Sequence, residues 1–302
     1  MSGVRRELLR GLERLDATTI VLQRARLADP LRGMWEAADL QWWWRRPRVT
    51  DELALPVWFD DVGPVAAVGL TDWNDRWQVD VFAVPDIVDE TDVWAAMLES
   101  VPGHWDGEIE LLVHEISPLV GLALRSGFEM TDDTFGTTWM AADQRPSVAQ
   151  VDGYTIVDRV IRSERPHPMI ARNGDVVQTR LRQCSLYDPT LDLAVEDARG
   201  NVAGYALFWF DPVTLVGLLE PMRVEDDHQR RGLARVLLTN GLDRLAQSGA
   251  RRLKVGFETE PARKLYTGAG FTQTSSERRL VRRSGTSLSE QHFVEGAAPE
   301  AE

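Results

Sequence analysis

Apolar residues follow two different periods in the C-terminal part of the chain. Residues 216–224 form a largely apolar run that is typical of a strand. A polar turn comes next, and beyond it large apolar side chains recur at helical spacing on one face, namely Leu233, Val236, Leu237, Leu242 and Leu245. A further strand is expected at 251–258. The pattern therefore predicts a strand, a polar turn and an amphipathic helix, followed by another strand.

A similar pattern occurs earlier in the chain, which indicates an internal duplication. Residues 63–70 (GPVAAVGL) parallel 200–207 (GNVAGYAL), and 119–128 (LVGLALRSGF) parallel 262–271 (ARKLYTGAGF). Each copy mixes strands and helices over ~130–140 residues, which favours a mixed α/β fold. A polar stretch that contains proline, at 144–148, predicts the boundary between them. We expect domains at 1–145 and 146–284, and a disordered tail at 285–302 that is rich in small and acidic residues.

Charge and cysteine content narrow the classes of function. The net charge of −13 argues against a nucleic-acid-binding protein, which normally has a basic face. It would favour a cationic acceptor if the acidic residues gather near a cleft, although solubility alone could explain it.

The single cysteine, Cys184, excludes an intramolecular disulfide and favours a reducing compartment. No apolar run approaches ~20 residues and no signal peptide is visible, so we expect a cytoplasmic protein without a membrane segment.

The polar turn before the helix has the chemistry of an anion site. A helix N-terminus presents backbone N–H groups without intrahelical partners, and Gly232 allows a ligand to approach the backbone closely. The turn has neither the Gly-Lys-Ser/Thr ending of a Walker loop nor the Gly-x-Gly-x-x-Gly of dinucleotide sites. The turn is therefore expected to bind a phosphate group as part of a motif other than these two.

Two motifs together resemble the GNAT family of N-acetyltransferases. The first is Gln-x-x-Gly-x-Ala at 229–234, and the second is Ala-x-x-Leu-Tyr-x-x-x-Gly-Phe at 262–271. The resemblance implies two tandem GNAT-like domains, each a mixed, splayed central sheet flanked by helices, with acetyl-CoA as co-substrate. It places the pyrophosphate on Gln229, Arg230, Arg231, Gly232, Leu233, Ala234 and Arg235, and the pantetheine arm on Met222, Arg223 and Val224. Thr259 would contact the cofactor at a position where the family usually has Asn.

The two copies differ in what this resemblance implies for activity. The first copy has no Gln-x-x-Gly-x-Ala after its corresponding strand, and Ala123 stands where the second copy has Tyr266. Residues 1–145 are therefore expected to form a degenerate domain with a structural or acceptor-binding role, and 146–284 to form the catalytic domain.

Acetyl transfer from a thioester to an amine needs a base for the amine and an acid for the leaving thiolate. Tyr266 is the expected acid, since a phenol stays protonated at neutral pH; the alternative is an aromatic residue that only packs the helix. Glu220 is the expected base, because a carboxylate in an apolar strand is unusual and partial burial would raise its pKa. The alternative is an ion pair with Arg223 or another arginine, and many relatives carry their carboxylate two residues earlier, at Leu218 here.

The remaining chemistry-bearing residues support simpler interpretations. The run Trp42-Trp43-Trp44 could form an aromatic wall for an acceptor, but packing between the two copies is the more economical explanation. Cys184 is interpreted as a buried thiol and His228 as a polar turn residue. No histidine has metal-ligand spacing with cysteine or acidic residues, so no metal is expected.

These observations lead to one main hypothesis and two alternatives. The main hypothesis is an acetyl-CoA-dependent N-acetyltransferase that acts on a primary amine of a small molecule or peptide, as a monomer or homodimer. A non-catalytic acyl-CoA-binding or regulatory protein is one alternative. Acetylation of a cysteinyl amine, as in mycothiol synthase, whose tandem architecture is similar, is the other.

Overall fold

One continuous sheet organises the molecule. The computed structural model describes residues 3–31, 33–103, 105 and 107–283. The strands are β1 (Arg5–Leu9), β2 (Leu55–Phe59), β3 (Pro64–Asp72), β4 (Arg76–Ala83), β5 (Glu108–His114), β6 (Glu129–Ala141), β7 (Tyr154–Asp158), β8 (Asp192–Asp197), β9 (Val202–Asp211), β10 (Val216–Val224), β11 (Arg252–Phe257) and β12 (Thr272–Arg283). Their order in the sheet is β1-β2-β3-β4-β5-β12-β6-β11-β10-β9-β8-β7. The predicted strands at 216–224 and 251–258 are observed as β10 and β11.

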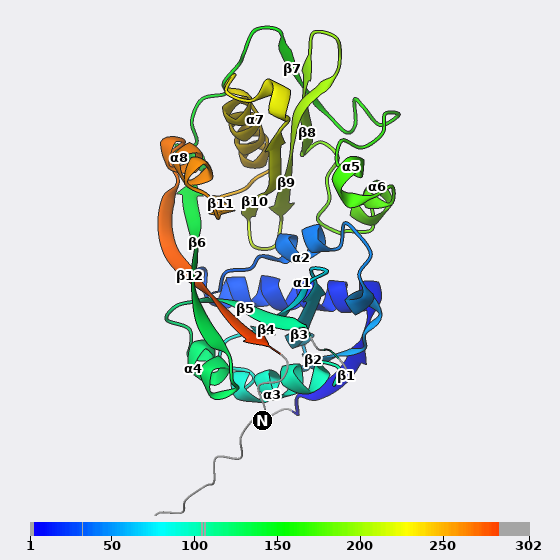
Figure 1. The fold of residues 1–302 in the computed structure, drawn as a ribbon, viewed down its shortest axis with the longest axis vertical. Coiled ribbons are helices and arrows are strands. Elements are labelled where there is room, and N and C mark those ends of the chain that lie inside the picture. Colours follow the sequence, from blue (N-terminus) through cyan, green and yellow to red (C-terminus); the bar gives the residue numbers. More distant parts are fainter. Residues whose placement is uncertain (1–2, 32, 104, 106, 284–302) are drawn as a thin grey trace, which may run out of the picture.

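The helices repeat in the same order in both halves (Figure 1). They are α1 (Gly11–Ala28), α2 (Ala37–Trp43), α3 (Glu90–Ser100) and α4 (Pro118–Arg125), then α5 (Ile170–Asn173), α6 (Val177–Leu181), α7 (Leu233–Gln247) and α8 (Glu260–Gly268). Short 3-10 helices occur at Val49–Glu52, Ala142–Gln144 and Asp226–His228. Each half therefore runs strand, two helices, three strands, helix, strand, helix, strand, which confirms the tandem α/β fold. The expected tail at 285–302 lies outside the described residues.

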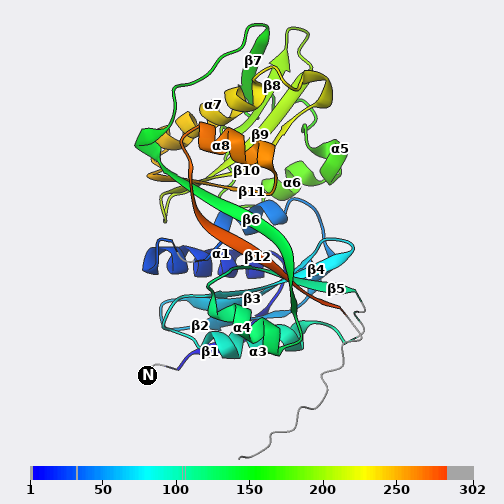
Figure 2. The same cartoon turned by 60° about the vertical axis from the view of Figure 1, so that its left-hand side comes forward.

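The last strand of each half is exchanged with the other half. β6 pairs with β11 from Arg252↔Ala141 to Phe257↔Gly136, and β12 lies between β5 and β6. These two long strands cross between the halves and pair with each other (Figure 2). Backbone hydrogen bonds therefore join the halves through the middle of the sheet.

Each half has one place where two parallel strands separate. β4 pairs with β5 only from Arg76↔Glu108 to Gln78↔Glu110. β10 pairs with β11 only from Val216↔Arg252 to Leu218↔Lys254. Beyond these short ladders the facing strand edges are open, which confirms the splayed sheet that was expected in each copy.

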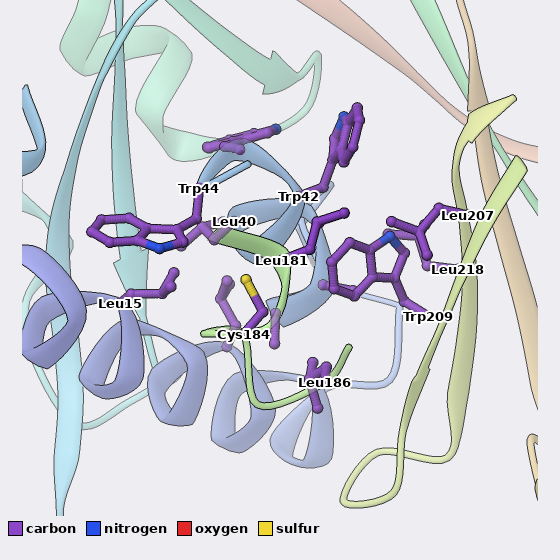
Figure 3. Close-up of a cluster of buried hydrophobic side chains, with 14 of the residues drawn as sticks. Leu15, Leu40, Trp42, Trp44, Leu181, Cys184, Leu186, Leu207, Trp209 and Leu218 are labelled. Carbon is purple, nitrogen blue, oxygen red and sulfur yellow. The ribbon is translucent and has the colours of Figure 1, made fainter. Parts of the chain in front are cut away.

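The tryptophan run packs between the halves, as predicted. Trp42, Trp43 and Trp44 are only 5%, 9% and 8% exposed, and they share one core with Leu181 and Trp209 of the other half (Figure 3). The Trp44 indole donates to the Gln183 side chain at 2.9 Å, and Arg180 stacks on its ring at 3.5 Å. All three indoles can be buried because α2 is enclosed by both halves.

Candidate active site

The turn between β10 and α7 forms an open set of backbone donors. Arg230 and Gly232 both have positive φ, 61° and 83°, and α7 begins at Leu233, which is buried in the core. Among the described residues, the backbone N–H groups of residues 230–234 have no hydrogen-bond acceptor. Successive unpaired amides at the positive end of a fifteen-residue helix make a site for an anion such as a pyrophosphate.

The side chains around this turn divide into paired and available groups. Gln229 donates to Asp226 at 3.0 Å, and Arg223 pairs with Glu225 at 3.5 Å and with Asp226 at 3.2 Å. Within the described part of the chain, no ion pair involves Arg230, Arg231 or Arg235, whose side chains lie at the exposed end of the helix. Arg231 donates to the Asp227 carbonyl oxygen at 3.3 Å. The charges of Arg230, Arg231 and Arg235 are therefore available to an anionic group.

The strand that leads to the turn has one free edge. Met222, Arg223 and Val224 pair with Ala206, Tyr205 and Gly204 of β9, with a register shift after Leu219. Their other edge faces the opening toward β11. An extended ligand arm can add to such an edge as an extra strand.

Thr259 has a structural role in this fold. Its hydroxyl accepts a hydrogen bond from the Ala262 N–H at 3.4 Å and so caps α8, and the residue is exposed. Threonine and asparagine are both good N-caps, which explains how one can stand for the other at this position.

Glu220 and Tyr266 meet in a cleft of about 380 Å³ between β10, β11 and α8. The cleft occupies the opening where β10 and β11 separate. Its wall includes residues of both halves, since Trp35 and Asp39 from the α1–α2 region complete it. The structure thus brings together the two side chains that the sequence suggested as base and acid.

Burial raises the pKa of the Glu220 carboxyl to about 7. The negative charge of Asp39 acts in the same direction, whereas Arg45 and the Trp42 indole oppose it. The alternative ion pair with Arg223 does not form, because Arg223 pairs with Glu225 and Asp226. Glu220 can therefore exist in both protonation states near neutral pH.

Tyr266 is buried and stays protonated. Its side chain is 7% exposed, and burial together with the Glu220 charge raises the pKa of its phenol above the usual value. Its ring also meets Phe271 edge-on, with centroids 6.2 Å apart. The residue thus packs α8 against the sheet and also presents a proton donor to the cleft.

The sequence suggested a structural or acceptor-binding role for the first half, but it did not identify the residues of that half that lie at this cleft. Lys254 of β11 is 3% exposed and pairs with Glu36 at 2.9 Å, and Arg26 pairs with the same carboxylate at 2.6 Å. Asp39 accepts from the Glu36 N–H at 2.7 Å, and burial raises its pKa to about 6. The one sequence feature that could have indicated this ion pair is a lysine, Lys254, within the largely apolar run 252–257.

The corresponding opening in the first half differs at the helix that follows its strand. A cleft of about 410 Å³ lies between β4 and β5, lined by Asp80, Val81 and Leu111–Val113 among others. The nearby helix α3 is capped by its own Asp89 side chain, which accepts from the Thr91 N–H at 2.8 Å. A carboxylate at this position occupies the Thr91 amide, and its charge repels phosphate.

Other candidate chemistries find no support in the described residues. Cys184 is buried, and burial raises the pKa of its thiol to about 12. Within the described ranges no three His, Cys, Asp or Glu side chains are grouped to hold a metal ion. The helices of the same ranges are all too short or too polar to cross a membrane. His104 and His292 lie outside these ranges.

Comparison with known proteins agrees with this geometry. Residues 159–271 match the acetyltransferase (GNAT) family. No curated protein sequence matches the chain. Among solved structures, the fold is similar to a tandem GNAT protein from the clavulanic acid biosynthesis pathway, with a TM-score of 0.67, 16% identity and coverage of 94% of this chain and 100% of that one.

Two further structures share the fold at low identity. A GCN5-related N-acetyltransferase from Sphaerobacter thermophilus has a TM-score of 0.56 and 14% identity, and the match covers 93% of this chain and 95% of that one. The glucosamine N-acetyltransferase region of a fungal multi-domain β-N-acetylglucosaminidase has a TM-score of 0.59 and 15% identity, over 93% of this chain and 38% of that one. Residues 159–271 therefore carry an acetyltransferase (GNAT) family domain, and the chain as a whole shares the fold of a tandem GNAT protein.

Proposed function

We propose that the protein transfers an acetyl group from acetyl-CoA to a primary amine, in the cleft between β10 and β11. The observation that carries this proposal is the position of Glu220 and Tyr266 in one cleft, beside an open strand edge and the open amides of residues 230–234. These amides fit the pyrophosphate, and the free edge of Met222–Val224 fits the pantetheine arm.

The side chains suit the two proton transfers of the reaction. The thioester supplies the acetyl group, and the amine nitrogen forms the new C–N bond as the C–S bond breaks. Glu220, with a pKa of about 7, accepts the proton that the amine must lose. Tyr266 is protonated and buried, and its hydroxyl donates a proton to the departing sulfur.

In this proposal the halves have different tasks. Residues 146–284 carry the reaction, although β6 of the first half pairs with their strand β11. Residues 1–145 form a degenerate copy that closes the acceptor side of the cleft with Trp35 and Asp39. The acceptor is a small-molecule or peptide amine that enters on this side.

Binding of acetyl-CoA tests the proposal through Gly232. Aspartate and asparagine at this position share the same backbone strain at φ 83°, and their Cβ meets only Val151 at 3.6 Å. The two variants therefore differ only in charge. Calorimetric titration with acetyl-CoA should show one binding site in the wild type. Gly232→Asn should lose only the affinity that the backbone strain costs, and Gly232→Asp should bind acetyl-CoA about 10²-fold more weakly than Gly232→Asn.

Release of thiol from acetyl-CoA in the presence of amines completes the test. Equal affinities of the Asp and Asn variants would contradict the assignment of the pyrophosphate to this turn. Binding without amine-dependent thiol release would contradict the catalytic role.

A further inference from the structure

Glu277 of β12 is a buried carboxylate with one oxygen that has no partner. The residue is 1% exposed and lies in the wall of the cleft that holds Glu220 and Tyr266. Its Oε1 atom accepts from the Ser275 hydroxyl at 2.5 Å. Its Oε2 atom has no hydrogen-bond partner among the described residues. A buried carboxylate in this state is destabilising unless a cation or donor meets it.

The cations on this part of the sheet are engaged with other carboxylates. Arg279, two residues along β12, pairs with Glu110 at 3.3 Å and with Asp133 at 3.2 Å. Lys254, in the wall of the same cleft, pairs with Glu36 at 2.9 Å. His114 is the cross-strand neighbour of Glu277, and its Nδ1 accepts from the Ile116 N–H at 3.3 Å. No ion pair within the described ranges neutralises Glu277.

The sheet order indicates how far Glu277 lies from the proposed base, Glu220. In the sheet, β6 and β11 lie between β12 and β10, and β10 has left β11 beyond Leu218, so that the strands of Glu277 and Glu220 are more than three regular spacings, about 14 Å, apart. Leu112 and Phe135 also line the cleft. The wall of the cleft therefore has two acidic groups on strands that are not neighbours, together with apolar side chains.

The net charge of the wall favours a cationic ligand. Four carboxylates line the cleft, those of Asp39, Glu220, Glu258 and Glu277, against a single lysine that is already paired. The sequence left open whether the acidity of the chain serves solubility or an acceptor. Here acidic residues do gather around the cleft.

We propose that the acceptor is a linear molecule with two cationic groups, one of which is acetylated beside Glu220 while the other binds Glu277. This inference rests on the proposed function of the same cleft. The second cation would give Glu277 Oε2 its missing donor, and a methylene spacer would contact Leu112 and Phe135.

The test compares an α,ω-diamine of about eight carbons with the n-alkyl monoamine of equal length, as acceptors with acetyl-CoA. The wild type should have a kcat/KM about 10- to 100-fold higher for the diamine, which is the usual range for one charge-assisted hydrogen bond. Glu277→Gln should remove this preference and leave the rate with the monoamine within about threefold. Glu258→Gln, a change at an exposed position of the same wall, is the matched control and should retain most of the preference.

Calorimetric binding of the diamine without acetyl-CoA separates this inference from the proposed function. Diamine binding that Glu277→Gln weakens, without any turnover, would support the cation site at Glu277 and contradict the transferase reaction. Acetylation of the diamine and the monoamine at equal rates by the wild type would overturn the inference and leave the proposed function intact. An equal loss for both amines in Glu277→Gln, with unchanged acetyl-CoA affinity, would also overturn it, because the carboxylate would then serve only the shape of the cleft.

Discussion

Replacement of Glu220 by glutamine tests the proposed base directly. With a pKa of about 7, the carboxyl of Glu220 would be about one-tenth ionised at pH 6 and about nine-tenths ionised at pH 8. If the ionised form accepts the proton of the amine, its contribution to kcat/KM rises about tenfold over this interval. Removal of a general base lowers the rate by about 10²- to 10⁴-fold. Glu220→Gln should therefore be slow, and its profile should lack the inflection near pH 7.

The assay measures initial rates of thiol release from pH 5.5 to 8.5. Protonation of the amine adds a slope that wild type and variant share, so that the ratio of their kcat/KM values isolates Glu220. This ratio should rise about tenfold from pH 6 and level off near pH 8. Asp39→Asn removes a neighbouring negative charge and should shift the inflection to lower pH. A ratio that does not depend on pH would refute the role of Glu220.

Three further predictions concern the acid, the core and acid stability. Tyr266→Phe should lower kcat by about 10²-fold and leave acetyl-CoA affinity unchanged; an unaltered kcat would leave the tyrosine a packing residue. Gly241→Ala should lower the free energy of unfolding by about 1–3 kcal/mol in denaturant titration, because the new Cβ would lie 2.0 Å from the Phe208 ring. Alanine normally favours a helix over glycine, so a gain in stability would contradict this packing. Burial raises the pKa of Asp80 from 3.8 to about 7, so the folded state keeps a proton that the unfolded chain has lost. The contribution of Asp80 to stability should therefore fall as the pH rises from about 4 to about 7. Asp80→Asn should remove this part of the pH dependence of the unfolding midpoint, and an identical pH dependence in the variant would exclude the contribution.

The parts of the site that were predicted from sequence depend on local structure. A turn with glycine at a helix N-terminus presents its amides whatever surrounds it, so that residues 229–235 could be recognised from their own spacing. Glu220 stood out because a carboxylate is rare in an apolar strand, and Tyr266 because of its place in the second motif. The duplication was visible because each copy keeps the same order of glycines and apolar runs.

The tertiary structure alone decided how the two copies combine. Nothing in the sequence of β6 or β12 indicates that each strand completes the sheet of the opposite half, since strand pairing depends on the path of the whole chain. The same path places Asp39 beside Glu220 and Glu36 beside Lys254, residues that are far apart in sequence. The sequence determined the chemistry of the loop and supplied the two candidates for proton transfer, because these depend on local motifs. The folded chain decided the charge around them, because burial and contacts between the halves set the pKa of Glu220, and the Oε2 atom of Glu277 has no partner among the described residues.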